Sequence, residues 1–131
     1  MKTEIILYVR DQSAAERFFT AVLETAPRLN VPGMTEYLLG EGCVLGLMPE
    51  KGIKRLLGQV LPDPEAGHGI PRAELYLTVA DPIRFHQRAL ACGAKELSPL
   101  LPRDWGDRAA YSLTEDGHVL VFAEPINVPG R

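Results

Sequence analysis

Cysteine is scarce in this sequence, and the scarcity limits the kinds of site that it can carry. The 131 residues include two cysteines, Cys43 and Cys92, with no CxxC spacing. Both fall inside apolar periodic segments, where thiols are usually free and buried, rather than in a zinc knuckle or a disulfide framework. We therefore expect free buried thiols and a cytoplasmic protein.

Long apolar runs are also missing. No segment approaches the ~20 apolar residues that a membrane-spanning helix needs, so no membrane partner is expected. The first residues, Met1 to Glu4, pass directly into a strand-like segment without the basic, apolar and small-residue regions of a secretory signal. This beginning again favours a cytoplasmic location.

Charge of one sign is not concentrated anywhere in the chain. The net charge is -3, and the 14 Lys and Arg residues are scattered, which argues against nucleic acid as a partner. Hydrophobic residues make up 46% and charged residues 24%, values typical of soluble globular proteins. A chain of this length forms about one domain, here taken as residues 1–131.

The first half of the chain has the pattern of a strand, a helix and three further strands. Apolar residues alternate over residues 4–9, as in a strand. Ser13 and Glu16 have the spacing of a capping box, which predicts a helix start, and Pro27 is expected to end that helix. Three short strands are predicted near residues 28–31, 35–39 and 43–48.

The second half repeats this plan. Its segment 77–81 has the pattern of segment 7–11, and Asp81 followed by Pro82 predicts the start of a helix that stops at Gly93. Strands are expected near residues 95–99, 108–113 and 118–124. The chain therefore reads as two βαβββ modules, about 1–50 and 72–125, joined by a linker or lid at about 49–72 with one helical turn at 53–57.

Three stretches carry a resemblance to a known family: "YVRDQSAAERFFTAVL", "LYLTVADPIRFHQRALACGAKEL" and "WGDRAAYSLTEDGHVLVFAE". They resemble the vicinal oxygen chelate superfamily, which includes glyoxalase I, extradiol dioxygenases, methylmalonyl-CoA epimerase and the fosfomycin- and bleomycin-resistance proteins. The resemblance implies an α+β fold in which two tandem βαβββ modules form curved mixed sheets with helices on their convex faces. It also implies a homodimer, and pairing of open sheet edges gives a physical reason for one.

In metal-using members of this superfamily the ligands lie on the first, fourth, fifth and last strands. The resemblance places Glu4 and Glu74 at two of these positions, and Gly46 and Val121, which cannot bind a metal, at the others. Two carboxylates without imidazole are a poor set for zinc, nickel or iron. We therefore expect no cofactor, with Glu4 and Glu74 as weak metal candidates unless His68 or a partner subunit adds a ligand.

Strand alternation identifies a candidate pocket. If the apolar residues at odd positions of the first strand cover a helix, the intervening side chains face the trough of the sheet. Aromatic rings beside carboxylates suit a flat, partly cationic ligand. The candidate ligand-binding residues are Glu4, Tyr8, Met48, Glu74, Tyr76, Trp105, Arg108, Tyr111 and Val121.

The function predicted from these features is metal-free binding of a small cationic or aromatic molecule, most similar to the bleomycin-resistance branch. The alternative is a metal-dependent lyase, isomerase or dioxygenase of the glyoxalase type. A coupled pair of carboxylates, Glu4 and Glu74, would allow acid–base catalysis without a metal if they face each other. A regulatory or protein-interaction module is a third class, so the sequence leaves open whether the protein is an enzyme.

Overall fold

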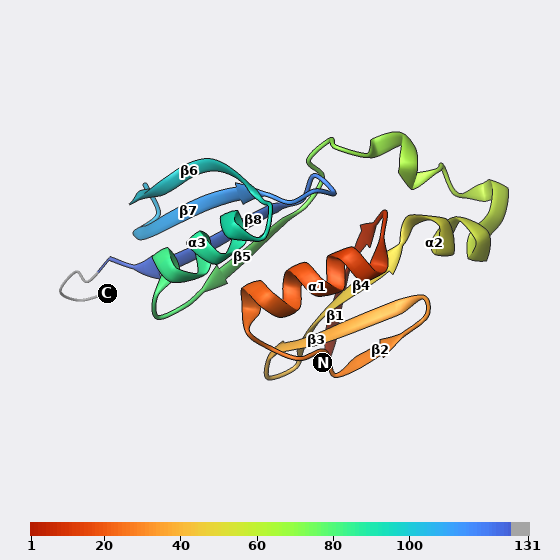
Figure 1. The fold of residues 1–131 in the computed structure, drawn as a ribbon, viewed down its shortest axis with the longest axis horizontal. Coiled ribbons are helices and arrows are strands. Elements are labelled where there is room, and N and C mark those ends of the chain that lie inside the picture. The colour runs from red at the N-terminus through yellow and green to blue at the C-terminus, as the bar shows by residue number, and fades with distance from the viewer. Residues whose placement is uncertain (127–131) are drawn as a thin grey trace. The chain divides into compact units, whose positions relative to one another are not determined.

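The structure, a computed structural model, describes residues 1–126 and divides into two compact units. The first unit is Met1–Gly69, and the second begins at Ile70. Each contains a four-stranded mixed sheet with a helix lying along it (Figure 1). The expected α+β fold of two tandem modules is therefore confirmed.

In the first unit the strand order is β1-β4-β3-β2, with β1 parallel to β4 and the remaining pairs antiparallel. Helix α1 covers one face of this sheet, where Phe19 packs against Tyr37 with ring centroids 6.4 Å apart. The strand residues on this face, among them Leu7, Leu45 and Leu47, are buried because they alternate toward the helix. The elements are β1 Thr3–Val9, α1 Gln12–Leu23, β2 Leu29–Val31, β3 Met34–Gly40 and β4 Cys43–Pro49.

The segment expected as a linker is part of the first unit and is more ordered than predicted. It forms helix α2 (Glu50–Leu57) and the short 3-10 helices η1 (Gly58–Val60) and η2 (Pro64–Gly67). The ammonium group of Lys54 donates to the carbonyl oxygens of Gly58 and Leu61, which holds the chain after α2 against the helix. Helix α2 begins three residues before the predicted turn at 53–57 and ends at the same residue.

The second unit repeats the topology, with strand order β5-β8-β7-β6 and β5 parallel to β8. Helix α3 covers one face of the sheet, where Phe85 lies against Phe122 with ring centroids 5.1 Å apart. Phe122 and its neighbours on this face, Ala110 and Leu120, are almost fully buried. The elements are β5 Glu74–Thr78, α3 Pro82–Ala91, β6 Lys95–Pro102, β7 Asp107–Leu113 and β8 Val119–Pro125.

The start and end of α1 differ from the prediction. Asp11, not Ser13, is the N-cap: its carboxylate accepts from the Ala14 amide at 3.0 Å, and its backbone is extended. The helix ends at Leu23, before Pro27, because Glu24 adopts a left-handed conformation with φ 50°. In the second unit the expected cap is confirmed, since the Asp81 carboxylate accepts from the Arg84 amide at 3.3 Å.

Both cysteines are free, but the expectation that they are buried is wrong. Cys92 is exposed because it follows the last turn of α3, and Cys43, at the start of β4, is half-buried. Over residues 1–126, no helix is long and apolar enough to cross a membrane.

Candidate functional site

The sheet of the second unit has an open face, on the side opposite α3, where aromatic and acidic side chains gather. Val121 in the middle of β8 pairs with Tyr76 of β5 on one side and Tyr111 of β7 on the other. Because directly paired residues point to the same face, the ring of Tyr76 lies on one side of Val121 and the ring of Tyr111 on the other. We call this surface the aromatic face; it comprises Glu74, Tyr76, Trp105, Asp107, Ala109, Tyr111, Val119, Val121 and Ala123.

A floor of small apolar residues supports the two tyrosines. Val121, Ala109 and Ala123 are fully buried, and Tyr76 and Tyr111 pack against them. The short side chains leave room for the rings to lie over the sheet. Val121 therefore belongs to the floor below the tyrosines and is not itself exposed to a ligand.

A chain of hydrogen bonds fixes the ring of Tyr76. Its hydroxyl donates to Oδ2 of Asp107 at 2.6 Å and accepts from the indole Nε1 of Trp105 at 2.9 Å. Burial, and then the hydrogen bond to Asp107, raises the pKa of Tyr76 above its usual value, so the phenol stays protonated at neutral pH. The hydrogen bond to Tyr76 holds the indole of Trp105 at its Nε1 edge, and the rest of the ring is accessible because Trp105 is 55% exposed.

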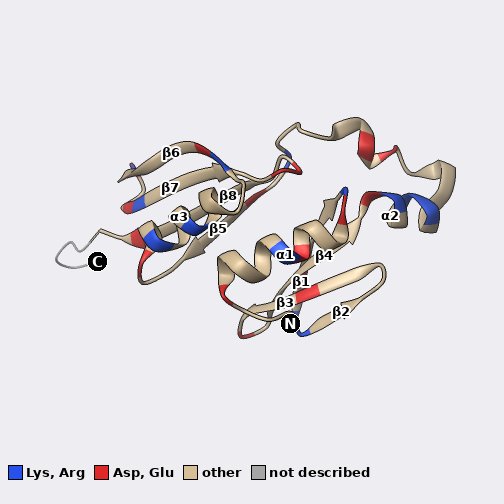
Figure 2. Cartoon of the chain, in the orientation of Figure 1, with Lys and Arg blue, Asp and Glu red and all other residues tan. Residues whose placement is uncertain are grey.

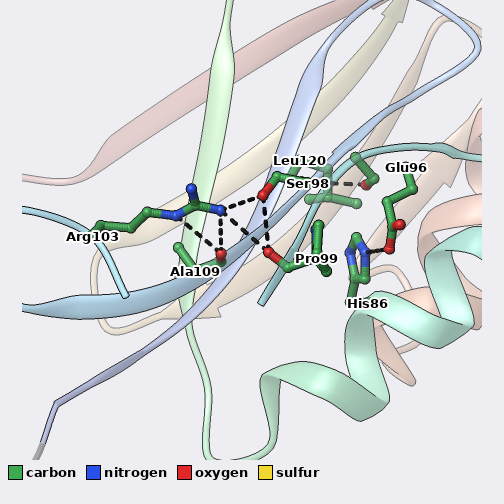
Figure 3. Close-up of polar contacts among 8 residues, drawn as sticks. His86, Glu96, Ser98, Pro99, Arg103, Ala109 and Leu120 are labelled. Atoms are coloured by element: carbon green, nitrogen blue, oxygen red, sulfur yellow. Dashed lines mark hydrogen bonds and ion pairs between the residues drawn. The ribbon is translucent and has the colours of Figure 1, made fainter. Parts of the chain in front are cut away.

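The ring of Tyr111 already carries a cation. The guanidinium carbon of Arg103 lies 4.9 Å from the ring centroid. The guanidinium donates to the Ala109 carbonyl at 2.8 Å and to the Ser98 hydroxyl at 2.6 Å, as Figure 3 shows. Burial, and then the negative charge of Glu74, raises the pKa of Tyr111. The guanidinium of Arg103 therefore covers the ring of Tyr111.

Arg108 does not lie on the aromatic face, although it was a candidate for ligand binding. It pairs in register with Glu124 of β8, and its Nε lies 3.4 Å from Oε1 of Glu124. Both residues alternate with Asp107 and Ala123, so they point toward the α3 side. Asp107, which sequence reasoning did not select, takes the place expected for Arg108.

The open face of the first unit's sheet carries a different group, the pair of glutamates Glu4 and Glu36. The hydrogen bond between their side chains raises the pKa of Glu4, and burial and the Glu36 charge add to the rise. The same hydrogen bond, together with Arg28, lowers the pKa of Glu36. Arg28 Nη2 lies 3.0 Å from Oε1 of Glu36. Glu36 was not predicted from the sequence.

Gly46 makes room for the glutamate pair. A Cβ at this position would lie 2.9 Å from Oε1 of Glu4, 3.0 Å from Ile6 and 3.3 Å from the Met34 sulfur. The space over this strand is therefore filled by neighbouring side chains. Tyr8 and Met48, two other candidates, pair in register on the same face and are half-buried.

Substituting Glu4 by glutamine tests the coupling of the two glutamates. In the wild type the raised pKa of Glu4 gives stability at low pH that is lost as the pH rises from 4.5, the unfolded value, through the folded pKa. Glutamine stays neutral and still donates to Glu36, so the variant should lack this loss. Urea unfolding at pH 4.5 and pH 7 should show the wild type weakening relative to Glu4→Gln. A difference that does not change with pH would contradict the coupling, and Glu41→Gln in the exposed β3–β4 turn is the control.

Two of the four positions at which the sequence resemblance places metal ligands lack a donor atom. In the first unit Glu36 raises the pKa of Glu4, and the fourth-strand position is Gly46, whose space is occupied. In the second unit the last-strand position is Val121, buried in an apolar cluster. Gly46 and Val121 have no side-chain donor atom, and the two remaining positions, Glu4 and Glu74, carry carboxylates without imidazole.

Comparison with known proteins gives likeness in structure only. No family model matches the chain, and no curated protein does. A glyoxalase-related enzyme from Fulvimarina pelagi is similar with a TM-score of 0.78 and 22% identity, over 95% of this chain and 87% of that one.

Two further solved structures are similar. One is a glyoxalase/bleomycin resistance protein/dioxygenase from Nocardioides, with a TM-score of 0.74 and 21% identity over 100% of this chain and 88% of that one. The other is a glyoxalase/bleomycin resistance protein/dioxygenase family enzyme from Burkholderia phytofirmans PsJN. It has a TM-score of 0.77 and 13% identity, over 94% of this chain and 97% of that one. At these identities the likeness shows the fold, which agrees with the fold that the sequence resemblance implied.

Proposed function

We propose that this protein binds a planar organic cation on the aromatic face of its second unit, without a metal. The observation that carries the proposal is the arrangement of Trp105, Tyr76 and Asp107. It combines an accessible indole, a fixed phenol and a carboxylate within one hydrogen-bonded chain. Such a set offers stacking and counter-charge to one ligand.

The exposure of Trp105 supports a binding role. Large aromatic residues are usually buried, yet this indole is 55% exposed while its Nε1 is anchored to Tyr76. An anchored ring loses little conformational entropy when a ligand stacks on it, which favours affinity.

The charges favour a cation over an anion. Asp107 and Glu74 are acidic members of the aromatic face, and Arg103 already uses its donors on Ala109 and Ser98. A ligand cation would approach the side of Tyr76 and Trp105, because the ring of Tyr111 is occupied by Arg103. A cation over an aromatic ring contributes about 0.5–1 kcal/mol at an exposed site and more where water is excluded.

The names of the similar structures include both bleomycin resistance and dioxygenase. The binding function is favoured here because Gly46 and Val121 stand at metal positions of the superfamily. The alternative of a metal-dependent lyase, isomerase or dioxygenase would need donor atoms at these two positions, where glycine and valine have none. A homodimer stays a prediction, which sedimentation of the purified protein would test.

Thermal unfolding with a panel of planar compounds tests the proposal. Ethidium and acridinium are the cationic probes, with a neutral anthracene derivative and a naphthalene sulfonate as controls. A cation present at about 100 times its Kd should stabilise the protein by about 2.7 kcal/mol, a rise of several degrees in Tm. The uncharged and anionic probes should give smaller shifts.

Three variants localise the effect. Trp105→Ala should weaken cation binding by about 2- to 10-fold, the value of one aromatic contact. Asp107→Asn should weaken it while retaining a polar partner for Tyr76. Arg108→Gln, next to Asp107 on the opposite face, is the matched control and should bind normally. Equal shifts in all four proteins, or no shift with any cation, would refute the proposal.

A further inference from the structure

Glu50 is a buried carboxylate that lacks the partners such a group normally has. It is the first residue of α2 and is 2% exposed. Both of its carboxylate oxygens are buried without a hydrogen-bond partner among the described residues. Burying a carboxylate costs several kcal/mol unless it is paired, hydrogen-bonded or coordinated to a metal. The position of Glu50 therefore calls for a ligand.

His68, the residue that follows η2, faces this carboxylate. Its Nδ1 lies 3.6 Å from Oε1 of Glu50 and is also buried without a hydrogen-bond partner in the described part of the chain. A separation of 3.6 Å is longer than a hydrogen bond. Three donor atoms, two oxygens and one nitrogen, are thus brought together within the first unit.

A second histidine–glutamate pair in the same chain shows what a direct contact looks like. Nε2 of His86 lies 2.9 Å from Oε2 of Glu96, a normal hydrogen bond (Figure 3). The Glu96 side chain is 45% exposed, so water solvates the rest of its carboxylate. Glu50, in contrast, has no histidine within hydrogen-bond distance among the described residues, and its side chain is shielded from water.

The spacing of Glu50 and His68 fits two ligands of one metal ion. Donors about 2.0–2.2 Å from an ion and about 110–120° apart are separated by about 3.3–3.8 Å. Imidazole with a carboxylate is a donor set suited to zinc and similar divalent transition metals. The ammonium group of Lys54, also on α2, is bonded to two carbonyl oxygens rather than to Glu50. Figure 2 shows the charges along this helix.

We propose that Glu50 and His68 bind a divalent transition metal of the zinc type. Glu50 supplies both carboxylate oxygens, His68 supplies Nδ1, and water completes a four-coordinate site. The ion joins the start of α2 to the end of η2, so it closes the segment between them and stabilises the first unit. This structural site is separate from the aromatic face and does not depend on the function proposed there.

Titration of the chelator-treated full chain with Zn²⁺ tests the site. We expect about one ion to bind per chain and the Tm to rise, because the ion binds the folded state. Co²⁺ should give visible absorption bands with the intensity of a four-coordinate site. Failure to bind either ion would overturn the proposal.

Variants then assign the ligands. Glu50→Gln and His68→Gln should each lower Zn²⁺ affinity by at least about tenfold, since even the outer-shell partners of metal ligands are worth about 10–100-fold. His86→Gln is the matched control and should bind Zn²⁺ like the wild type. If Glu50→Gln does not fold, His68→Gln with the Co²⁺ spectrum decides the matter. Unchanged affinity in His68→Gln, or loss of binding in Glu4→Gln instead, would place the ion elsewhere and overturn the proposal.

Discussion

Replacing Val121 by glutamate should destabilise the second unit rather than create a metal ligand. Val121 is fully buried in a cluster with Ala109 and Ala123, and the rings of two tyrosines pack against this cluster. A carboxylate there would be an unpaired buried charge, which costs roughly 3–5 kcal/mol. Urea unfolding followed by circular dichroism should show this loss, and adding Zn²⁺ should not restore it.

Val119→Glu is the matched control for this substitution. Val119 lies two residues earlier on the same face but is only half-buried, so its carboxylate can reach water. The cost should be clearly smaller than at position 121. Equal costs at the two positions, or a stable Val121→Glu protein that binds Zn²⁺, would contradict the assignment of Val121 to the floor of the aromatic face.

Phe122→Ala should have an effect of similar size through the other face of the sheet. Phe122 is fully buried and lies against Phe85 of α3, so truncation removes apolar contacts and leaves a cavity. Such substitutions cost about 3–5 kcal/mol. Ile83→Ala, on an exposed position of α3, is the control and should change the free energy of unfolding by much less. A loss below about 1 kcal/mol for Phe122→Ala would contradict the packing of α3 on this strand.

Much of the fold could be predicted from local signals. Period-two alternation and helix caps such as Asp81 gave the strands and helices of both modules, and the structure confirms them within a few residues. The capping box predicted at Ser13 was wrong, because Asp11, two residues earlier, also has a capping side chain and is the N-cap. The helix from Glu50 was only partly anticipated, although Pro49 before it and Gly58 after it are boundary signals.

The site was less predictable because its contacts join distant residues. Alternation alone places Tyr76 on one face of β5, but its partner Asp107 is 31 positions away and depends on strand register. The register also separates Asp107 from its neighbour Arg108. Glu36 was missed for the same reason, since its position beside Glu4 depends on the register of β3 with β4 and of β4 with β1.

Fluorescence of Trp105 gives the most direct test of metal-free cation binding on the aromatic face. It is the only tryptophan of the chain and lies in the proposed site, bonded to Tyr76. Titration with acridinium in the presence of a chelator should change its emission saturably, and Asp107→Asn should require a higher acridinium concentration. No saturable change with the cation, or the same titration curve in wild type and Asp107→Asn, would contradict the proposed function.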